Sequence, residues 1–125
     1  MSKTMKLLRN IDYEEKKSKF IVYLYEIDNQ EEFKSIYKQL KEEHKKARHI
    51  LRVGRFKNNY SIYIEEASDD KEPVSSMKKA ASYLENNDIK DRAVFIVRYF
   101  GGTKFGASYL DKVYSNLFFK IINEN

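Results

Sequence analysis

A continuously apolar run at residues 93–97, Ala-Val-Phe-Ile-Val, limits the possible folds more than any other feature of the sequence. Successive side chains of a strand point to opposite faces, and this run has no polar residue on either face. It is therefore predicted to form a central strand, covered by other parts of the chain on at least one face. Gly101 and Gly102 follow closely and are expected to end the strand in a turn.

The rest of the chain shows the periodicities of further strands and helices. Additional strands are predicted at residues 6–12, 19–27, 47–56 and 60–64. Helices are predicted at residues 28–40, 73–86 and 106–122, where apolar side chains recur at helical spacing. The order ββ-α-ββ-α-β-α, without any linker-like tract, predicts a single domain, residues 1–125, of the α+β class. We expect a mixed sheet with its helices packed on one face.

Two local signals indicate where helices begin. Asp28 is followed three residues later by Glu31, which is the spacing of a capping box, so Asp28 is expected to cap the first helix. Pro73 suits the first turn of the second helix. Amide hydrogens in that turn have no intrahelical acceptor, so a proline there loses no hydrogen bond.

Positive charge is concentrated in one segment. The 24 lysines and arginines exceed the 19 acidic residues by +5, and residues 41–57 hold seven of these cations against two glutamates. Arg48, Arg52 and Arg55 are expected on one solvent-facing side of the strand at 47–56. Such a segment is typical of a surface that binds an acidic partner such as RNA, although a solvated face of no further function has the same composition.

What the sequence lacks excludes several classes of protein. It has no cysteine, which excludes disulfides, cysteine-ligated metals and cysteine nucleophiles. No apolar run approaches the ~18 residues of a membrane span, and none of signal-peptide length follows Met1. His44 and His49 are the only histidines, and neither lies in a zinc or hydrolase motif. We expect a cytoplasmic protein that contacts no membrane and has no catalytic set, metal site or cofactor.

Three motifs, in order along the chain, resemble those of the IMPACT family (YigZ-like) N-terminal domain. Residues 98–114, RYFGGTKFGASYLDKVY, are similar to the signature R-Y-[FY]-G-G-x-x-L-G-x-G-G-L-x-[RK]-A-Y. Residues 68–73, SDDKEP, are similar to S-D-D-G-E-P, and residues 17–21, KSKFI, are similar to K-S-[RK]-F-I. His49 falls where the family places its histidine. The chain departs from these patterns where side chains replace family glycines, notably at Lys71 and at residues 75–80 and 108–109.

The resemblance implies both a fold and a field of action. The implied fold is that of the second domain of small-subunit ribosomal protein five, shared with domain four of elongation factor G and the ribonuclease P protein, which work on RNA. Eukaryotic relatives restrain a translation-inhibiting stress kinase by competing for its activating scaffold. Family members can also carry an N-terminal RWD domain or a C-terminal ferredoxin-like domain, and we expect neither in these residues.

The glycine turn is one candidate binding site. Arg98 and Lys104 flank Gly101 and Gly102, and backbone amides between a strand and a helix can hold a phosphate. A tight turn that requires a positive φ explains the two glycines equally well.

The acidic loop is a second candidate. Asp69, Asp70 and Glu72, with His49 nearby in the family pattern, could hold magnesium through carboxylate oxygens and water. Acids before a helix more often cap it, and a histidine on a strand is more often structural.

The sequence therefore favours a non-enzymatic binding module in translation or its stress control. Its partner would be RNA, the ribosome or a regulatory protein, contacted through the basic strand and the glycine turn. The alternative is a magnesium-dependent enzyme that acts on a phosphate-bearing substrate with the acidic loop. The sequence assigns no oligomeric state.

Overall fold

The computed structural model describes residues 5–123, which form five strands and three helices in the predicted order. The elements are β1 (Lys6–Glu15), β2 (Ser18–Glu26), α1 (Gln30–Glu43), β3 (His49–Lys57), β4 (Tyr63–Ser68), α2 (Ser76–Asn86), β5 (Arg92–Tyr99) and α3 (Ala107–Asn123). The predicted α+β class is confirmed. Within residues 5–123, no helix is both long and apolar enough to cross a membrane.

The five strands form one sheet in the order β1-β2-β5-β3-β4. The apolar run at 93–97 lies in β5, the middle strand, as predicted. The prediction of a mixed sheet is wrong, because every pairing between the described strands is antiparallel. Two hairpins, β1–β2 and β3–β4, enclose β5, and this order brings residues distant in sequence to the same end of the sheet.

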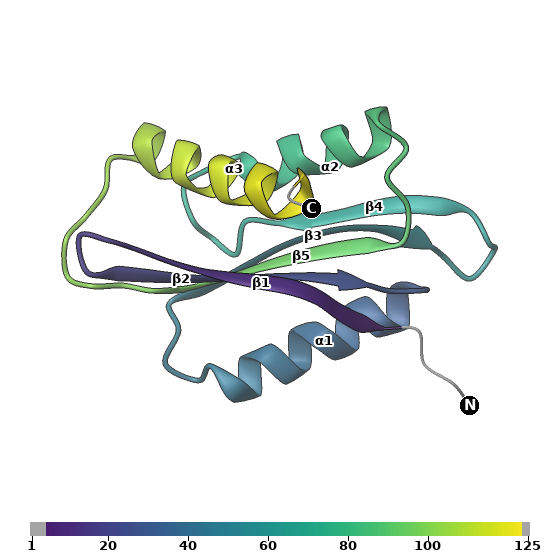
Figure 1. Ribbon diagram of the computed structural model, residues 1–125, viewed down its shortest axis with the longest axis horizontal. Helices are drawn as coiled ribbons and strands as arrows, with labels where there is room; N and C mark the ends of the chain where they lie inside the picture. The colour runs from purple at the N-terminus through teal and green to yellow at the C-terminus, as the bar shows by residue number, and fades with distance from the viewer. Residues whose placement is uncertain (1–4, 124–125) are drawn as a thin grey trace.

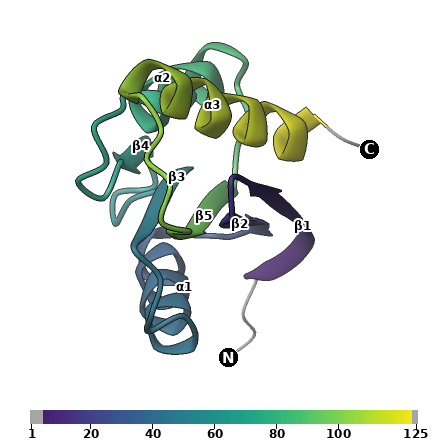
Figure 2. The same ribbon diagram turned by 90° about the vertical axis from the view of Figure 1, so that its left-hand side faces the viewer.

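Helices cover both faces of the sheet, with α2 and α3 on one side and α1 on the other (Figures 1 and 2). The expectation that all helices pack on one face is therefore wrong. The reason lies in β5, where Val94 and Ile96 belong to the core beneath α2 and α3, whereas Phe95 and Val97 belong to the core beneath α1. A strand that is apolar at every position needs cover on both faces.

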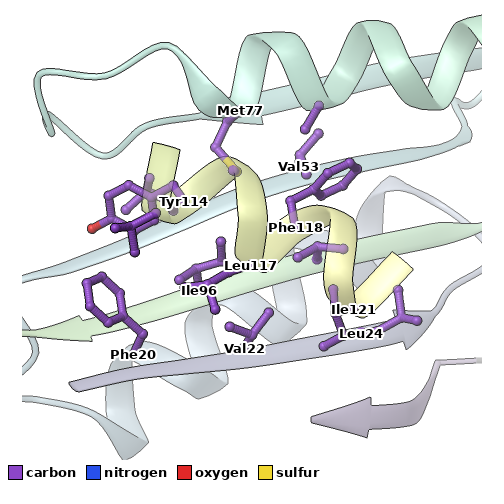
Figure 3. Close-up of a cluster of buried hydrophobic side chains, with 14 of the residues drawn as sticks. Phe20, Val22, Leu24, Val53, Met77, Ile96, Tyr114, Leu117, Phe118 and Ile121 are labelled. Carbon is purple, nitrogen blue, oxygen red and sulfur yellow. The ribbon is translucent and has the colours of Figure 1, made fainter. Parts of the chain in front are cut away.

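The larger core lies between the sheet and α3 (Figure 3). Phe20, Val22 and Leu24 of β2 point into it, and α3 supplies Leu117 and Phe118. All five side chains are at most 5% exposed. Burial of each stabilises the domain by about 1.5–3 kcal/mol relative to an exposed position.

The starts of the first two helices differ from the sequence expectations. Asn29, not Asp28, caps α1, since its side chain accepts the Glu32 amide hydrogen at 3.0 Å and the Glu32 carboxylate accepts the Asp28 amide hydrogen at 2.7 Å. The capping spacing is therefore present one residue further along the chain, and the Glu32 carboxylate accepts from the residue before the cap. Pro73 precedes α2, which begins at Ser76, because the acidic loop has its own turns before the helix.

Candidate functional site

Side chains from all three family-like motifs meet in one buried network. Arg98 of β5 forms an ion pair with Glu72 of the β4–α2 loop, with 2.7 Å between Nη1 and Oε2. The second Arg98 amino group, Nη2, donates to the Ser18 hydroxyl at 3.4 Å, and the Tyr114 hydroxyl of α3 donates to Glu72. Burial, and then the hydrogen bond to Glu72, raises the pKa of Tyr114. The network thus joins β2, β5, the acidic loop and α3.

His49 occupies the remaining oxygen of Glu72. Its Nε2 lies 3.3 Å from Glu72 Oε1, and its Nδ1 lies 2.7 Å from the Asp70 carbonyl oxygen. Because that carbonyl can only accept, Nδ1 carries the proton and donates. Glu72 Oε2 is therefore engaged by Arg98 and Tyr114, whereas Oε1 has the His49 ring beside it.

A cleft of 280 Å³ opens beside this network. Its lining residues are Arg48, His49, Glu72, Pro73, Arg98, Phe100, Lys104, Phe105 and Leu110. The Arg48 guanidinium lies over the Phe100 ring, with 4.7 Å to its centroid, and that of Arg98 lies 5.2 Å from the Phe105 centroid. Arg98 Nε is buried and has no hydrogen-bond partner among residues 5–123. The cleft is therefore rich in hydrogen-bond donors.

The two glycines have structural reasons for their identity. Gly101 donates its amide hydrogen to the Ser18 hydroxyl at 3.3 Å, and a Cβ atom on Gly101 would lie 2.1 Å from the Lys17 carbonyl carbon. Gly102 has φ +94°, a conformation that side-chain-bearing residues rarely adopt. The helix α3 begins only at Ala107, so neither glycine lies at its N-terminus.

The three acidic candidates point to different partners. Asp69 accepts the amide hydrogen of Met77, in the first turn of α2, at 3.1 Å, and burial raises the pKa of Asp69. Asp70 accepts the Ile50 amide hydrogen at 2.7 Å, whereas Glu72 belongs to the buried network. Within residues 5–123, no three histidine or carboxylate side chains are placed to hold a metal ion.

Two arginines of β3 are not part of the lining of the cleft and lie on opposite faces of the sheet. Arg52 stacks on Tyr37 of α1, with 3.6 Å to the ring centroid. Arg55 forms ion pairs with Glu65 and Asp88, both at 2.9 Å. The expected single arginine-bearing side is wrong, because residues three positions apart in a strand point to opposite faces.

A basic surface that the sequence predicts only in part lies at the end of the sheet beside the cleft. The register pairs Glu15 with Ser18, Lys19 with Tyr99 and His49 with Arg98, so three loops meet at this end, at the left in Figure 1. We call this end of the sheet the basic end. It has six exposed cations: Lys16, Lys17, Lys45, Lys46, Arg48 and Lys104.

The signal for these residues in the sequence is only partial. Ser18 and Tyr114 stand in the family-like motifs, yet their roles emerge only when the network is visible. Lys16 and Lys17 lie in a run of mixed charge at residues 14–19, which shows no excess that would mark a basic surface. Only the antiparallel pairing of β1 with β2 brings them to the basic end.

Fold and site together define an α+β domain in which a buried arginine–glutamate pair supports a cationic cleft at one end of an antiparallel sheet. Residues 16–122 match the Impact N-terminal domain, and the chain belongs to this family. The matched residues include the whole buried network and the entire lining of the cleft. The resemblance seen in the three motifs is therefore confirmed.

Two curated relatives are bacterial. An IMPACT family member of Haemophilus influenzae is 31% identical over 105 residues, which cover 81% of this chain and 50% of that protein. The IMPACT family member YvyE of Bacillus subtilis is 30% identical over 99 residues, covering 78% of this chain and 45% of YvyE. The chain thus spans about half the length of these relatives.

Two solved structures share the fold. The crystal structure of a hypothetical protein superposes with a TM-score of 0.81 at 25% identity, covering 99% of this chain and 62% of the other. The two-domain translational regulator Yih1 superposes with a TM-score of 0.56 at 17% identity, covering 94% of this chain and 46% of Yih1. The second likeness is one of fold alone.

Proposed function

We propose that this domain is a non-enzymatic binding module in the control of translation, and that it contacts RNA, free or on the ribosome, through the basic end. Membership of the IMPACT family supports the field of action, as does the fold shared with a protein described as a translational regulator. The proposed site of action is the cytoplasm, where ribosomes work.

The convergence of the six cations of the basic end carries this proposal. They come from the β1–β2 turn, the α1–β3 loop and the β5–α3 loop, and all are exposed. Within residues 5–123, none of the six forms an ion pair with a carboxylate, unlike Arg52 and Arg55. Exposed cations without acidic partners are available to phosphates, and the release of counterions from RNA then drives binding.

The geometry does not favour the enzymatic alternative. That alternative needs the carboxylates of Asp69, Asp70 and Glu72 to converge on one reacting centre. Each instead has a separate task, at the start of α2, at the Ile50 amide and in the buried network, respectively.

Co-sedimentation with ribosomes tests the proposal. The protein should pellet with purified ribosomes at low salt, and Lys16→Glu combined with Lys17→Glu should weaken this by at least about tenfold. Lys34→Glu with Lys38→Glu is the matched control, since both lysines are exposed on α1, and should bind as the parent does. Binding to protein-free ribosomal RNA should show the same dependence.

Three results would contradict the proposal. The first is no binding to ribosomes or ribosomal RNA at low salt. The second is equal loss in the test and control variants, which would indicate a nonspecific effect of charge. The third is binding to ribosomes that survives complete digestion of the accessible RNA, which would point instead to an acidic protein partner.

A further inference from the structure

We propose that the cleft beside the buried network is a subsite for a single phosphate group of the RNA, held by Arg48, Arg98 and Lys104. The inference rests on the proposed function and assigns a specific place to one of the phosphates. The proposal distinguishes this cleft from the rest of the basic end. There the lysines lie on exposed loops, which provide positive charge but no cleft.

The size of the cleft suits a small group. Its volume of 280 Å³ lies just below the roughly 300–1,000 Å³ of pockets for drug-sized ligands. The apolar walls of the cleft are Phe100, Phe105 and Leu110. They can contact the sugar attached to a phosphate, but they donate no hydrogen bond to the phosphate itself. The polar recognition must therefore come from the cationic side chains.

The charge of the cleft favours an anion. Arg48 approaches from the segment before β3 and Lys104 from the β5–α3 loop, so two cations reach the cleft from separate loops. Glu72 is the only carboxylate among the lining residues named above, and Arg98 and Tyr114 already engage its Oε2. Little acceptor capacity remains to bind a cation, whereas donors are in excess.

The buried arginine supplies an independent observation. Arg98 is 4% exposed, it lines the cleft, and its Nε–H has no hydrogen-bond partner within residues 5–123. Buried polar atoms of this kind are rare in folded proteins. The Nε atom itself is closed to solvent, so a ligand in the cleft reaches it only when the guanidinium turns towards the cleft. A phosphate oxygen is a suitable acceptor, because arginine donates charge-assisted hydrogen bonds to it in well-defined directions.

The aromatic walls hold the two arginines in place. Phe100 lies under Arg48 at 4.7 Å and beside Arg98 at 5.6 Å, measured from each guanidinium carbon to the ring centroid. Cation–π contacts of this kind restrict the side chains before a ligand arrives. Binding then costs less conformational entropy than it would on free surface lysines.

The test is an NMR titration of the full chain with inorganic phosphate, adenosine 5′-monophosphate and adenosine. Phosphate and the monophosphate should shift the backbone signals of Arg48, Gly102 and Lys104 in the millimolar range, and adenosine should not. Arg48→Gln with Lys104→Gln should bind phosphate about tenfold more weakly, because two charged donors are lost. Both residues are exposed, so the melting temperature of this variant should match the parent's.

A control and three outcomes make the test decisive. Lys34→Gln with Lys38→Gln should bind phosphate as the parent does, since these lysines lie outside the cleft. Absence of phosphate-dependent shifts, or equal shifts at Lys34 and Lys38, would overturn the subsite while leaving ribosome binding intact. Specific shifts in a protein that does not bind ribosomes or RNA would refute the proposed function and the assignment of the phosphate to RNA.

Discussion

Replacing Arg98 by methionine is expected to destabilise the domain severely. The substitution removes a buried positive charge and leaves the Glu72 carboxyl group, which is only 8% exposed, without its arginine partner. Breaking a buried ion pair by removing one partner costs about 3–5 kcal/mol. Tyr114 and His49 still contact Glu72, so we expect the lower part of this range. That is a large fraction of the roughly 5–15 kcal/mol that stabilises a typical domain.

A double variant isolates the electrostatic cause. Arg98→Met combined with Glu72→Gln removes both charges, and the amide of the new glutamine can still accept from Tyr114. The double variant should therefore be more stable than the Arg98→Met variant by about 1–3 kcal/mol, as expected for coupled neighbours. A loss caused only by poor packing of methionine would not be recovered in this way.

Urea unfolding at neutral pH measures the free energy of unfolding of the parent and of each variant. The midpoint should fall in Arg98→Met with little change in the slope, since the surface exposed on unfolding is nearly the same. Two results would refute the reasoning. One is a loss of unfolding free energy below about 1 kcal/mol in Arg98→Met. The other is a loss in the double variant that equals the sum of the losses in Arg98→Met and Glu72→Gln, each measured alone.

Three further perturbations follow from single contacts. Gly101→Ala should destabilise the domain by more than about 2 kcal/mol because the added Cβ would lie 2.1 Å from Lys17 backbone. Gly106→Ala, which meets nothing within 4 Å, should be near neutral in the same melting experiment, and equal losses would contradict the packing argument. Hydrogen bonds from a serine hydroxyl and a lysine lower the pKa of Asp111 to about 2, so Asp111→Asn should cost about 1–2 kcal/mol at pH 7 after allowance for partial exposure. That difference should persist above the unfolded pKa near 4 and disappear as the pH falls towards 2, and a difference independent of pH would contradict it. Arg55→Glu places a carboxylate directly opposite that of Glu65 across the β3–β4 pair. The melting temperature should therefore fall by several degrees. An unchanged melting temperature would show that the two ion pairs of Arg55 contribute nothing to stability.

The sequence predicted the central strand because its signal is local. A run of five apolar residues in β5 needs no knowledge of the rest of the chain. The same run did not reveal that both faces would be covered, since a strand buried on one face is also compatible with it. The strand period did contain the information that Arg52 and Arg55 point to opposite faces, but their shared basic charge suggested a single surface.

The candidate site was predictable in part. Arg48, His49, Glu72, Arg98 and Lys104 do line one cleft, and their motifs singled them out. The ion pair itself joins residues that are 26 positions apart, and no local spacing encodes such a contact. It depends on the strand order, which sets β5 beside both hairpins.

The salt dependence of RNA binding tests the central claim most directly. Fluorescence anisotropy with a single-stranded RNA, titrated from about 50 to about 200 mM salt, gives the slope of log affinity against log salt, about −0.7 for each phosphate contacted. If the six cations of the basic end contact five phosphates, with Arg48 and Lys104 sharing one, the slope approaches about −3.5, and Arg48→Gln with Lys104→Gln reduces its magnitude by about 0.7. A slope near zero, or one that this double substitution leaves unchanged, would contradict the account.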